Sequence, residues 1–249
     1  MNPDMNNTQR SCFITGTDTG VGKTHFSTSL LRSLAQHPEY QDKRIVGMKP
    51  VAAGSELING RYDNDDVLLL RAASNWAAPP GLDNPVLLHD ALSPHIAAQR
   101  AGVEIDIAHL VACHRQLMQQ ADVVVVEGAG GFHVPLSQEL TGADLACALG
   151  LPVILVVGLR LGCLNHAVLT AEAIRNRGLR LAGWVANEIN PSMEAQDDNI
   201  RYLQHQLQAP MLAHLPHQPQ TTHQTDQHEP LTSTPFIRIE NLWPKHTPG

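Results

Sequence analysis

The sequence predicts an α/β fold in which a doubly wound, mainly parallel β-sheet is flanked by helices. Short apolar, β-branched runs alternate along the chain with segments whose apolar residues recur at helical spacing. Several of these runs, such as VVVV within Asp122–Glu127, are continuous, as expected of parallel strands covered on both faces. The expected strands are Cys12–Thr15, Arg44–Lys49, Asp122–Glu127, Pro152–Gly158, Leu181–Asn187 and Pro210–Leu215.

Amphipathic helices are expected between these strands. Their apolar stripes comprise Phe26, Leu30, Leu31 and Leu34, then Ile107, Leu110, Val111, Leu117 and Met118, then Ala167, Val168, Ala171 and Ile174. A shorter helix, Val67–Ala73, follows an acidic stretch. In a doubly wound sheet, ligands bind beyond the carboxyl ends of the strands, so the residues that follow each strand are the candidates for function.

Length and composition indicate one domain with an appended tail. The chain has 249 residues, of which 43% are hydrophobic and 16% charged, an ordinary globular composition. We expect a single domain over residues 1–218 and a polar, Pro-punctuated tail over residues 219–249, part of which could dock onto the domain. The net charge of −7 and the absence of a basic patch argue against a nucleic-acid partner or an acidic membrane surface.

The same survey predicts a cytoplasmic protein that is not bound to a membrane. The N-terminal segment is polar, and the longest apolar run, Leu151–Leu159, is too short to span a bilayer. The four cysteines are scattered and predict neither a disulfide framework nor a zinc site. The 14 histidines show no recurring ligand spacing, so we interpret them as solvated surface residues.

The segment Cys12–Phe26, CFITGTDTGVGKTHF, is the strongest functional signal. A strand, a turn rich in Gly and Thr, and a helix start would together form a phosphate cradle, in which Lys23 supplies charge and Thr24 ligates Mg²⁺. The common pattern has Gly where this chain has Thr17, although Gly16 stands one residue earlier. The alternative is an ordinary strand–turn–helix with a surface lysine.

Two charged residues close other expected strands. Lys49 ends the second strand and could stabilise charge on a transferred phosphoryl group, or could be a surface lysine. Glu127 ends the VVVVE run, where a buried carboxylate needs a partner, and small residues (Gly128, Ala129, Gly130, Gly131) follow it. Glu127 is therefore a candidate Mg²⁺ ligand, with capping of the next helix as the alternative. Asp63, Asp65 and Asp66, taken alone, suit capping of the following helix.

Taken together, these segments resemble the dethiobiotin synthetases, ligases of the P-loop NTPase fold. The resemblance rests on motifs in family order across about residues 10–218, and leaves the end of the tail uncovered. The motifs are GTDTGVGKT (Gly16–Thr24), GMKPVAAGS (Gly47–Ser55), Asn64-x-Asp66, Asn84-Pro85, SPH (Ser93–His95), VEGAGG (Val126–Gly131), PVILVVG (Pro152–Gly158), LGCLNHAVLTAEAI (Leu161–Ile174) and GWVAN (Gly183–Asn187).

The resemblance implies an activity, ligands and residue roles. The implied reaction is the ATP- and Mg²⁺-dependent ring closure of 7,8-diaminononanoate with CO₂ (or bicarbonate) to dethiobiotin, by a homodimer whose substrate site lies at the subunit interface. Implied catalytic residues are Lys49, Lys23 and Thr19, and implied metal ligands are Thr24, Asp66 (with Asp65 as a competitor) and Glu127. Implied ATP contacts are Gly20, Val21, Gly22, Lys23, Thr24, His25, Asp66, Glu127, Gly128, Ala129, Gly130, Asn187, Pro216, His217 and Gln218. Implied substrate contacts are Thr19, Lys49, Ala53, Gly162, Cys163, Leu164 and Asn165.

One departure from the family and two rival functions remain in view. Ala53 stands where the family often has a serine that contacts substrate, which predicts weaker or rerouted binding. A ParA/MinD-like ATPase switch is one rival, but those proteins typically carry an extra lysine at about Gly16–Asp18, and this chain has none. The other rival is a regulatory nucleotide-binding module with a different diamine substrate or none.

Overall fold

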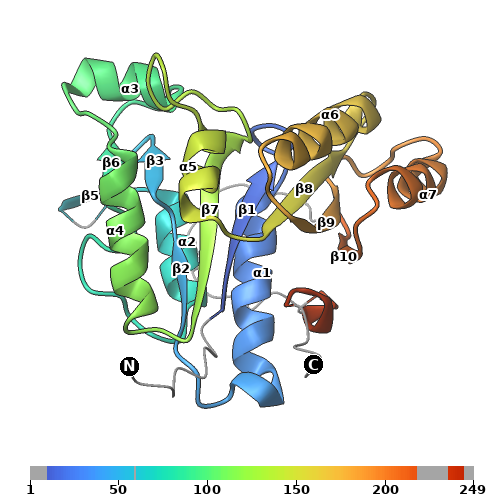
Figure 1. Ribbon diagram of the computed structural model, residues 1–249, viewed down its shortest axis with the longest axis horizontal. Coiled ribbons are helices and arrows are strands. Elements are labelled where there is room, and N and C mark those ends of the chain that lie inside the picture. The colour runs from blue at the N-terminus through green and yellow to red at the C-terminus, as the bar shows by residue number, and fades with distance from the viewer. Residues whose placement is uncertain (1–9, 59, 218–234, 244–249) are drawn as a thin grey trace.

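A six-stranded parallel sheet forms the centre of the computed structural model, which describes residues 10–58, 60–217 and 235–243 (Figure 1). Its strand order is β10-β9-β8-β1-β7-β2, and every neighbouring pair is parallel. The predicted fold class and all six predicted strands are confirmed. The strands are β1 (Arg10–Gly16), β2 (Ile45–Met48), β7 (Val123–Gly131), β8 (Val153–Leu159), β9 (Leu181–Glu188) and β10 (Met211–Leu215).

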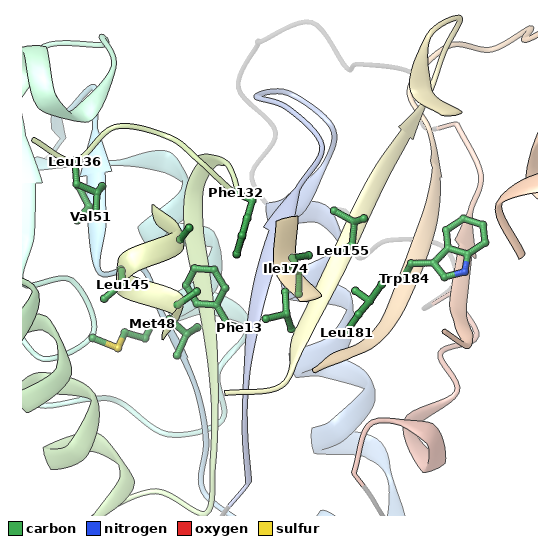
Figure 2. Packing of buried hydrophobic residues seen from close by; sticks show 14 of the residues in the cluster. Phe13, Met48, Val51, Phe132, Leu136, Leu145, Leu155, Ile174, Leu181 and Trp184 are labelled. Carbon is green, nitrogen blue, oxygen red and sulfur yellow. The ribbon is translucent and has the colours of Figure 1, made fainter. Parts of the chain in front are cut away.

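Helices cover both faces of this sheet, which explains the continuous apolar strands. One face packs against α1 (Lys23–Gln36) and α2 (Asp65–Ala73), and the other against α4 (Ile107–Met118), α5 (Gly142–Leu149), α6 (Cys163–Asn176) and α7 (Gln196–Gln206). Successive side chains of β1 alternate between the two cores. Phe13 joins the core beneath α4, α5, α6 and α7, and Cys12 and Ile14 join the core beneath α1 and α2. Figure 2 shows Phe13 and Trp184 among the packed side chains of the larger core.

Two small sheets stand at the rim beyond β2. In one, β3 (Val51–Ala53) pairs in parallel with β6 (Val86–Leu88); in the other, β4 (Glu56–Ile58) pairs antiparallel with β5 (Arg61–Asp63). Helix α3 (Pro94–Ala101) lies beside β3 and β6 (Figure 1). The sequence did not predict these strands, because three residues are too few for a periodic signal. These two sheets lie at the carboxyl end of β2, where Lys49 is located.

Strand β7 is longer than the sequence indicated. It continues four residues past the predicted end at Glu127, to Gly131. Glu127 pairs with Ile14, and Gly131 pairs with Gly16 across an irregularity in the register. Glu127 is therefore held inside the sheet, and the small residues after it lie beside the start of the phosphate loop.

The C-terminal segment 235–243, which we call the C-terminal strap, packs along the edge strand β10. The N–H of Arg238 donates to the carbonyl oxygen of Leu212 at 2.9 Å, and Ile237, Ile239 and Leu242 are buried in the core beside α1. Within the described residues, no helix is long and apolar enough to cross a membrane.

Candidate active site

The predicted phosphate loop connects β1 to α1. Gly20 and Gly22 adopt positive φ angles of 72° and 88°, which favour glycine. A Cβ atom on Gly22 would lie 2.0 Å from the side-chain nitrogen of Asn187, so this position tolerates no side chain. The first backbone N–H groups of α1 are left for a ligand, because no side chain caps this helix start.

Lys23 lies folded against this loop. Its Nζ donates to the carbonyl oxygen of Asp18 at 3.1 Å, and the side chain is buried. Burial, together with the nearby Lys49 ammonium, lowers the pKa of Lys23 to about 8. An anion in the loop would reverse this effect, because it favours the charged ammonium.

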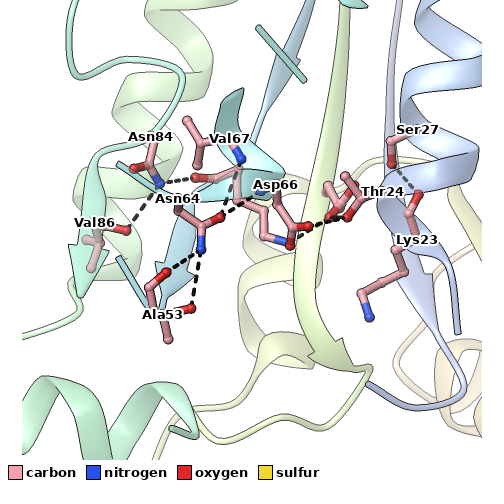
Figure 3. Close-up of polar contacts among 12 residues, drawn as sticks. Lys23, Thr24, Ser27, Ala53, Asn64, Asp66, Val67, Asn84 and Val86 are labelled. Carbon is pink, nitrogen blue, oxygen red and sulfur yellow. Dashed lines mark hydrogen bonds and ion pairs between the residues drawn. The ribbon is translucent and has the colours of Figure 1, made fainter. Parts of the chain in front are cut away.

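Two carboxylates converge on the hydroxyl of Thr24, and Figure 3 shows one of them, Asp66, beside it. Thr24 Oγ1 lies 2.8 Å from Asp66 Oδ1 and 2.8 Å from Glu127 Oε1, although one hydroxyl proton can serve only one of them. The second carboxylate oxygen of Glu127, Oε2, is buried and has no hydrogen-bond partner in the described part of the chain. Hard oxygen ligands left short of donors fit Mg²⁺. Within the described residues no group of three or more His, Cys, Asp or Glu side chains gathers at one point, so Thr24 and ligand oxygens would complete this site.

Asp66 rather than its neighbour contacts Thr24. Asp65 is exposed, whereas Asp66 lies between Thr24 and Lys49. The geometry therefore favours Asp66 over Asp65 as the acidic partner from α2. Burial alone would raise the pKa of Asp66, but the charge of Lys49, the hydrogen bonds from Lys49 and Thr24, and the charge of Lys23 together lower it.

Lys49 is buried at the centre of the charged cluster. Its Nζ lies 2.6 Å from Glu127 Oε1 and 2.7 Å from Asp66 Oδ2, and only 5% of the residue is exposed. Burial lowers the pKa of Lys49, but the carboxylates of Glu127 and Asp66 raise it further, so it stays above its ordinary value. These contacts are incompatible with the alternative of a surface lysine, and they leave Glu127 no role in capping a helix.

Residues outside the predicted set hold Lys49 and Asp66 in place. The side-chain amide of Asn84 donates to the carbonyl oxygen of Lys49 at 2.7 Å. The backbone N–H of Lys49 donates to the carbonyl oxygen of Asp83, also at 2.7 Å. Asn64 caps α2 through the N–H groups of Asp66 and Val67, and donates to Gly54 at 2.8 Å (Figure 3). The sequence motifs include Asn64 and Asn84, but the motifs did not predict that these residues position Asp66 and Lys49.

A cavity of about 590 Å³ opens beside the charged cluster. Thr19, Lys49 and Ala53, three of the predicted substrate contacts, line it. Asp66, Ala129 and Gly130 also line it, as do Ser93 and Pro94 at the start of α3. At position 53 this cavity presents a methyl group. An amphipathic small molecule would fit a volume of this size.

The remaining predicted contacts fall in two places. Asn187 is buried and donates to the carbonyl oxygen of Val21 at 2.9 Å, so it lies against the phosphate loop, near His25. Pro216 and His217 follow β10 in the neighbouring part of the rim, and Gln218 lies outside the described residues. Gly162, Cys163, Leu164 and Asn165 start α6 and are not among the residues that line the 590 Å³ cavity.

Parallel strand ends, a glycine-rich loop at a helix start and a buried Lys–carboxylate cluster define a P-loop nucleotide-binding protein. Two solved structures share the fold. The ParA family ATPase of Chlorobium tepidum TLS has a TM-score of 0.52 at 14% identity, with 85% of each chain covered. The septum site-determining protein MinD of Pyrococcus horikoshii OT3 has a TM-score of 0.54 at 15% identity, covering 84% of this chain and 81% of that one. A family model described as an AAA domain matches residues 10–225.

The sequence relatives narrow this class. The chain is 53% identical over 211 residues to the ATP-dependent dethiobiotin synthetase BioD of Aromatoleum aromaticum, covering 84% of this chain and 91% of that protein. It is 50% identical over 210 residues to the protein of the same name from Janthinobacterium sp. (strain Marseille), covering 83% and 87%. This chain belongs to the ATP-dependent dethiobiotin synthetase family, and the resemblance inferred from its motifs is confirmed.

Proposed function

We propose that this protein is an ATP-dependent cyclo-ligase that closes the ureido ring of dethiobiotin from 7,8-diaminononanoate and CO₂, in biotin biosynthesis. The observation that carries the proposal is the buried Lys49, which lies within 2.7 Å of two carboxylates between a phosphate loop and the 590 Å³ cavity. The identity of 50–53% to dethiobiotin synthetases supports this function over the ATPase-switch alternative.

The reaction divides into three steps that conserve atoms. One amine of the diamine attacks CO₂ and loses a proton, which gives a carbamate. A carbamate oxygen attacks the γ-phosphorus of ATP and ADP leaves, which gives a carbamic–phosphoric anhydride. The second amine attacks the carbonyl carbon and loses a proton, phosphate leaves, and the ring closes.

This chain's charged side chains would position and neutralise the reacting groups. Lys23, at the loop, would hold the phosphates, and Thr19, which lines the cavity, would contact the carbamate. Lys49 stands between loop and cavity, where its ammonium would stabilise the negative charge of the carbamate and of the transferred phosphoryl group.

Thr24, Asp66 and Glu127 would hold Mg²⁺. The Thr24 hydroxyl lies 2.8 Å from one oxygen of each carboxylate, and Glu127 Oε2 has no hydrogen-bond partner among the described residues. Bound there with ATP, Mg²⁺ would neutralise charge on the phosphate oxygens. Gly20, Val21, Gly22 and His25 would surround the phosphates with backbone groups, Gly128, Ala129 and Gly130 would face them, and Asn187 with Pro216, His217 and Gln218 would bind the base.

A homodimer would complete the substrate site. Two leucines of this region are exposed: Leu161, just before α6, is 98% exposed, and Leu169 on α6 is 54% exposed. Large apolar side chains of this kind favour burial against a second subunit. Gly162, Cys163, Leu164 and Asn165 would then receive the substrate carboxylate of the other subunit at a helix start. We place the protein in the cytoplasm, where thiols stay reduced, because all four cysteines are free.

The decisive experiment is a mass-spectrometric assay for dethiobiotin. The pure protein is mixed with ATP, Mg²⁺, bicarbonate and 7,8-diaminononanoate, and ADP is followed with and without the diamine. Diamine-dependent ADP matched by dethiobiotin is expected. ATP binding without product would favour a regulatory module or a paralogue with another substrate, for which Ala53 is the first residue to test.

Mixing two inactive variants tests the shared site. Lys49→Ala and Asn165→Ala would each impair both sites of a homodimer, whereas a mixed dimer would retain one site with both residues intact. If the site spans the interface, mixing the two variants restores turnover. If each site is formed within one subunit, the mixture stays as inactive as its components.

A further inference from the structure

A second cavity, of about 350 Å³, lies between α1, β10 and the C-terminal strap. His25 lines it from α1, His214 and Pro216 from β10 and the residue after it, and Phe236 and Arg238 from the strap. Three of these five carry flat aromatic rings, and the proline ring adds an apolar surface. Such a lining suits a planar heteroaromatic ligand.

Phe236 is the most unusual residue of this lining. It is 78% exposed, although its neighbours Ile237 and Ile239 are 6% and 5% exposed. The strap backbone is fixed beside it, because the Arg238 N–H donates to Leu212 at 2.9 Å. Anchored neighbours thus hold a large aromatic ring at the cavity wall with little of its own surface buried. A rigid, uncovered ring of this kind is a ready stacking surface.

The cavity adjoins the phosphate loop through His25. This residue directly follows Thr24, and its side chain lies beside Asn187, whose amide donates to the carbonyl oxygen of Val21 in the loop. The Nε2 atom of His25 is buried without a hydrogen-bond partner. A nucleotide with its phosphates in the loop would bring its base toward this unpartnered side chain.

We propose that Phe236 stacks on the base of the bound nucleotide, so that the C-terminal strap forms one wall of the base site. The strap lies beyond residues 10–225, the part of the chain that the family model matches. It therefore adds a base contact that the matched part of the chain does not supply. The inference rests on the proposed function only in taking the ligand to be ATP.

Calorimetric titration of the full-length protein tests this contact. Wild type, Phe236→Ala, Phe236→Trp and Tyr202→Ala are each titrated with ATP and with inorganic tripolyphosphate, in Mg²⁺. Tyr202 is the matched control, because it is an exposed aromatic residue on α7 that does not line the cavity. We expect Phe236→Ala to weaken ATP binding about tenfold, the scale of losing one stacked base, and Phe236→Trp to retain it.

Tripolyphosphate separates the base contact from the phosphate loop. It carries the phosphates without a base, so its Kd should be unchanged by Phe236→Ala, and Tyr202→Ala should change neither Kd. An unchanged Kd for ATP in Phe236→Ala, or an equal loss for ATP and tripolyphosphate, would overturn the proposal. Dethiobiotin formation by the wild type is measured separately. If the wild type forms dethiobiotin but Phe236→Ala binds ATP as tightly as the wild type, only the stacking proposal fails. If the wild type forms no dethiobiotin but Phe236→Ala binds ATP more weakly, only the proposed ligase function fails.

Discussion

At the scale of single residues, the site is a balance of buried charges. Lys23 and Lys49 supply two cations, and Asp66 and Glu127 supply two carboxylates, all within the cluster around Thr24. Glu127 is 0% exposed, and a carboxylate in such a place is stable only with close partners. The cluster is therefore organised before any ligand arrives, which reduces the reorganisation that catalysis would require.

Lys49→Ala should separate binding from chemistry. We expect ATP binding to remain largely intact, because Lys23 and the loop hold the phosphates, while turnover falls at least a hundredfold, the scale of losing a transition-state contact. Calorimetry gives the Kd, a steady-state assay gives kcat, and thermal unfolding shows whether the variant is folded. Full activity in a folded variant would remove Lys49 from the mechanism.

His114 predicts an acid sensitivity unrelated to catalysis. It is buried on α4, its Nε2 lies 2.9 Å from Ser11 Oγ, and burial lowers its pKa from the ordinary 6.5 to about 4. Because the folded protein then binds fewer protons than the unfolded chain below pH 6.5, this residue's contribution to stability is lost as the pH falls from 6.5 toward 4.

The expected size of this effect is roughly 2 kcal/mol of unfolding free energy between pH 7 and pH 5. His114→Gln removes the titrating group, so its stability should fall less over the same interval by about that amount. Urea unfolding of both proteins at the two pH values measures the difference. Parallel losses in the two proteins would show that His114 does not titrate as described.

At the scale of elements, α2 is positioned by its first residues. Asn64 caps the helix through its side-chain oxygen and, through its amide nitrogen, holds the backbone of Gly54 after β3. One side chain thus joins the helix that carries Asp66 to the strand that follows Lys49. The short sheets at the rim have few residues of their own, so such side-chain connections fix their place.

Variants at Asn64 divide these two contributions. Asn64→Ala removes both and should lower the unfolding free energy by about 1–2 kcal/mol. Asn64→Asp keeps the capping oxygen and loses only the donor to Gly54, so it should recover most of the cap's contribution. Denaturant unfolding at neutral pH ranks the three proteins. Equal losses in both variants would show that the donor to Gly54, rather than the cap, is the important contact.

At the scale of the whole molecule, the C-terminal strap completes the fold. Its buried residues fill the core beside α1, and the Arg238 N–H donates to the Leu212 carbonyl oxygen on the outer edge of β10, where a free strand edge would expose unpaired backbone groups. The strap thus connects the C-terminal end of the described chain to the start of β1. Trp243 lies beside Tyr40, and the Tyr40 hydroxyl accepts a hydrogen bond from Arg10 at the start of β1.

Leu242→Ala measures what the strap contributes to stability. Leu242 is 1% exposed, so its truncation should lower the unfolding free energy by about 2–5 kcal/mol. Phe236→Ala is the matched control in the same segment, and with 78% of Phe236 exposed it should change stability little. A chain that ends at Asp226 should lose more than Leu242→Ala and should aggregate through the uncovered edge. Unchanged unfolding of both Leu242→Ala and the shortened chain would mean that the strap is not part of the folded core.

Local patterns in the sequence determined most of the fold and the centre of the site. Six strands, the phosphate loop, Lys49 and Glu127 were all predictable, because strand runs, glycine turns and the alternation of elements are written in neighbouring residues. The end of β7 was misplaced by four residues, since glycines usually close a strand and here continue it beside the loop.

Tertiary structure decided the contacts that depend on distant segments. The paired strands β3 and β6, and the paired strands β4 and β5, have three residues each, so they are defined by their pairing partners rather than by a sequence pattern. Asp66 rather than Asp65 meets Thr24 because of how α2 packs against α1, and local sequence carries no signal for that rotation. Local sequence also carries no signal for the strap, where packing against the edge of β10 decides that Ile237 is buried and Phe236 is exposed. Residues close in sequence specify elements, whereas packing between elements specifies which side chains meet.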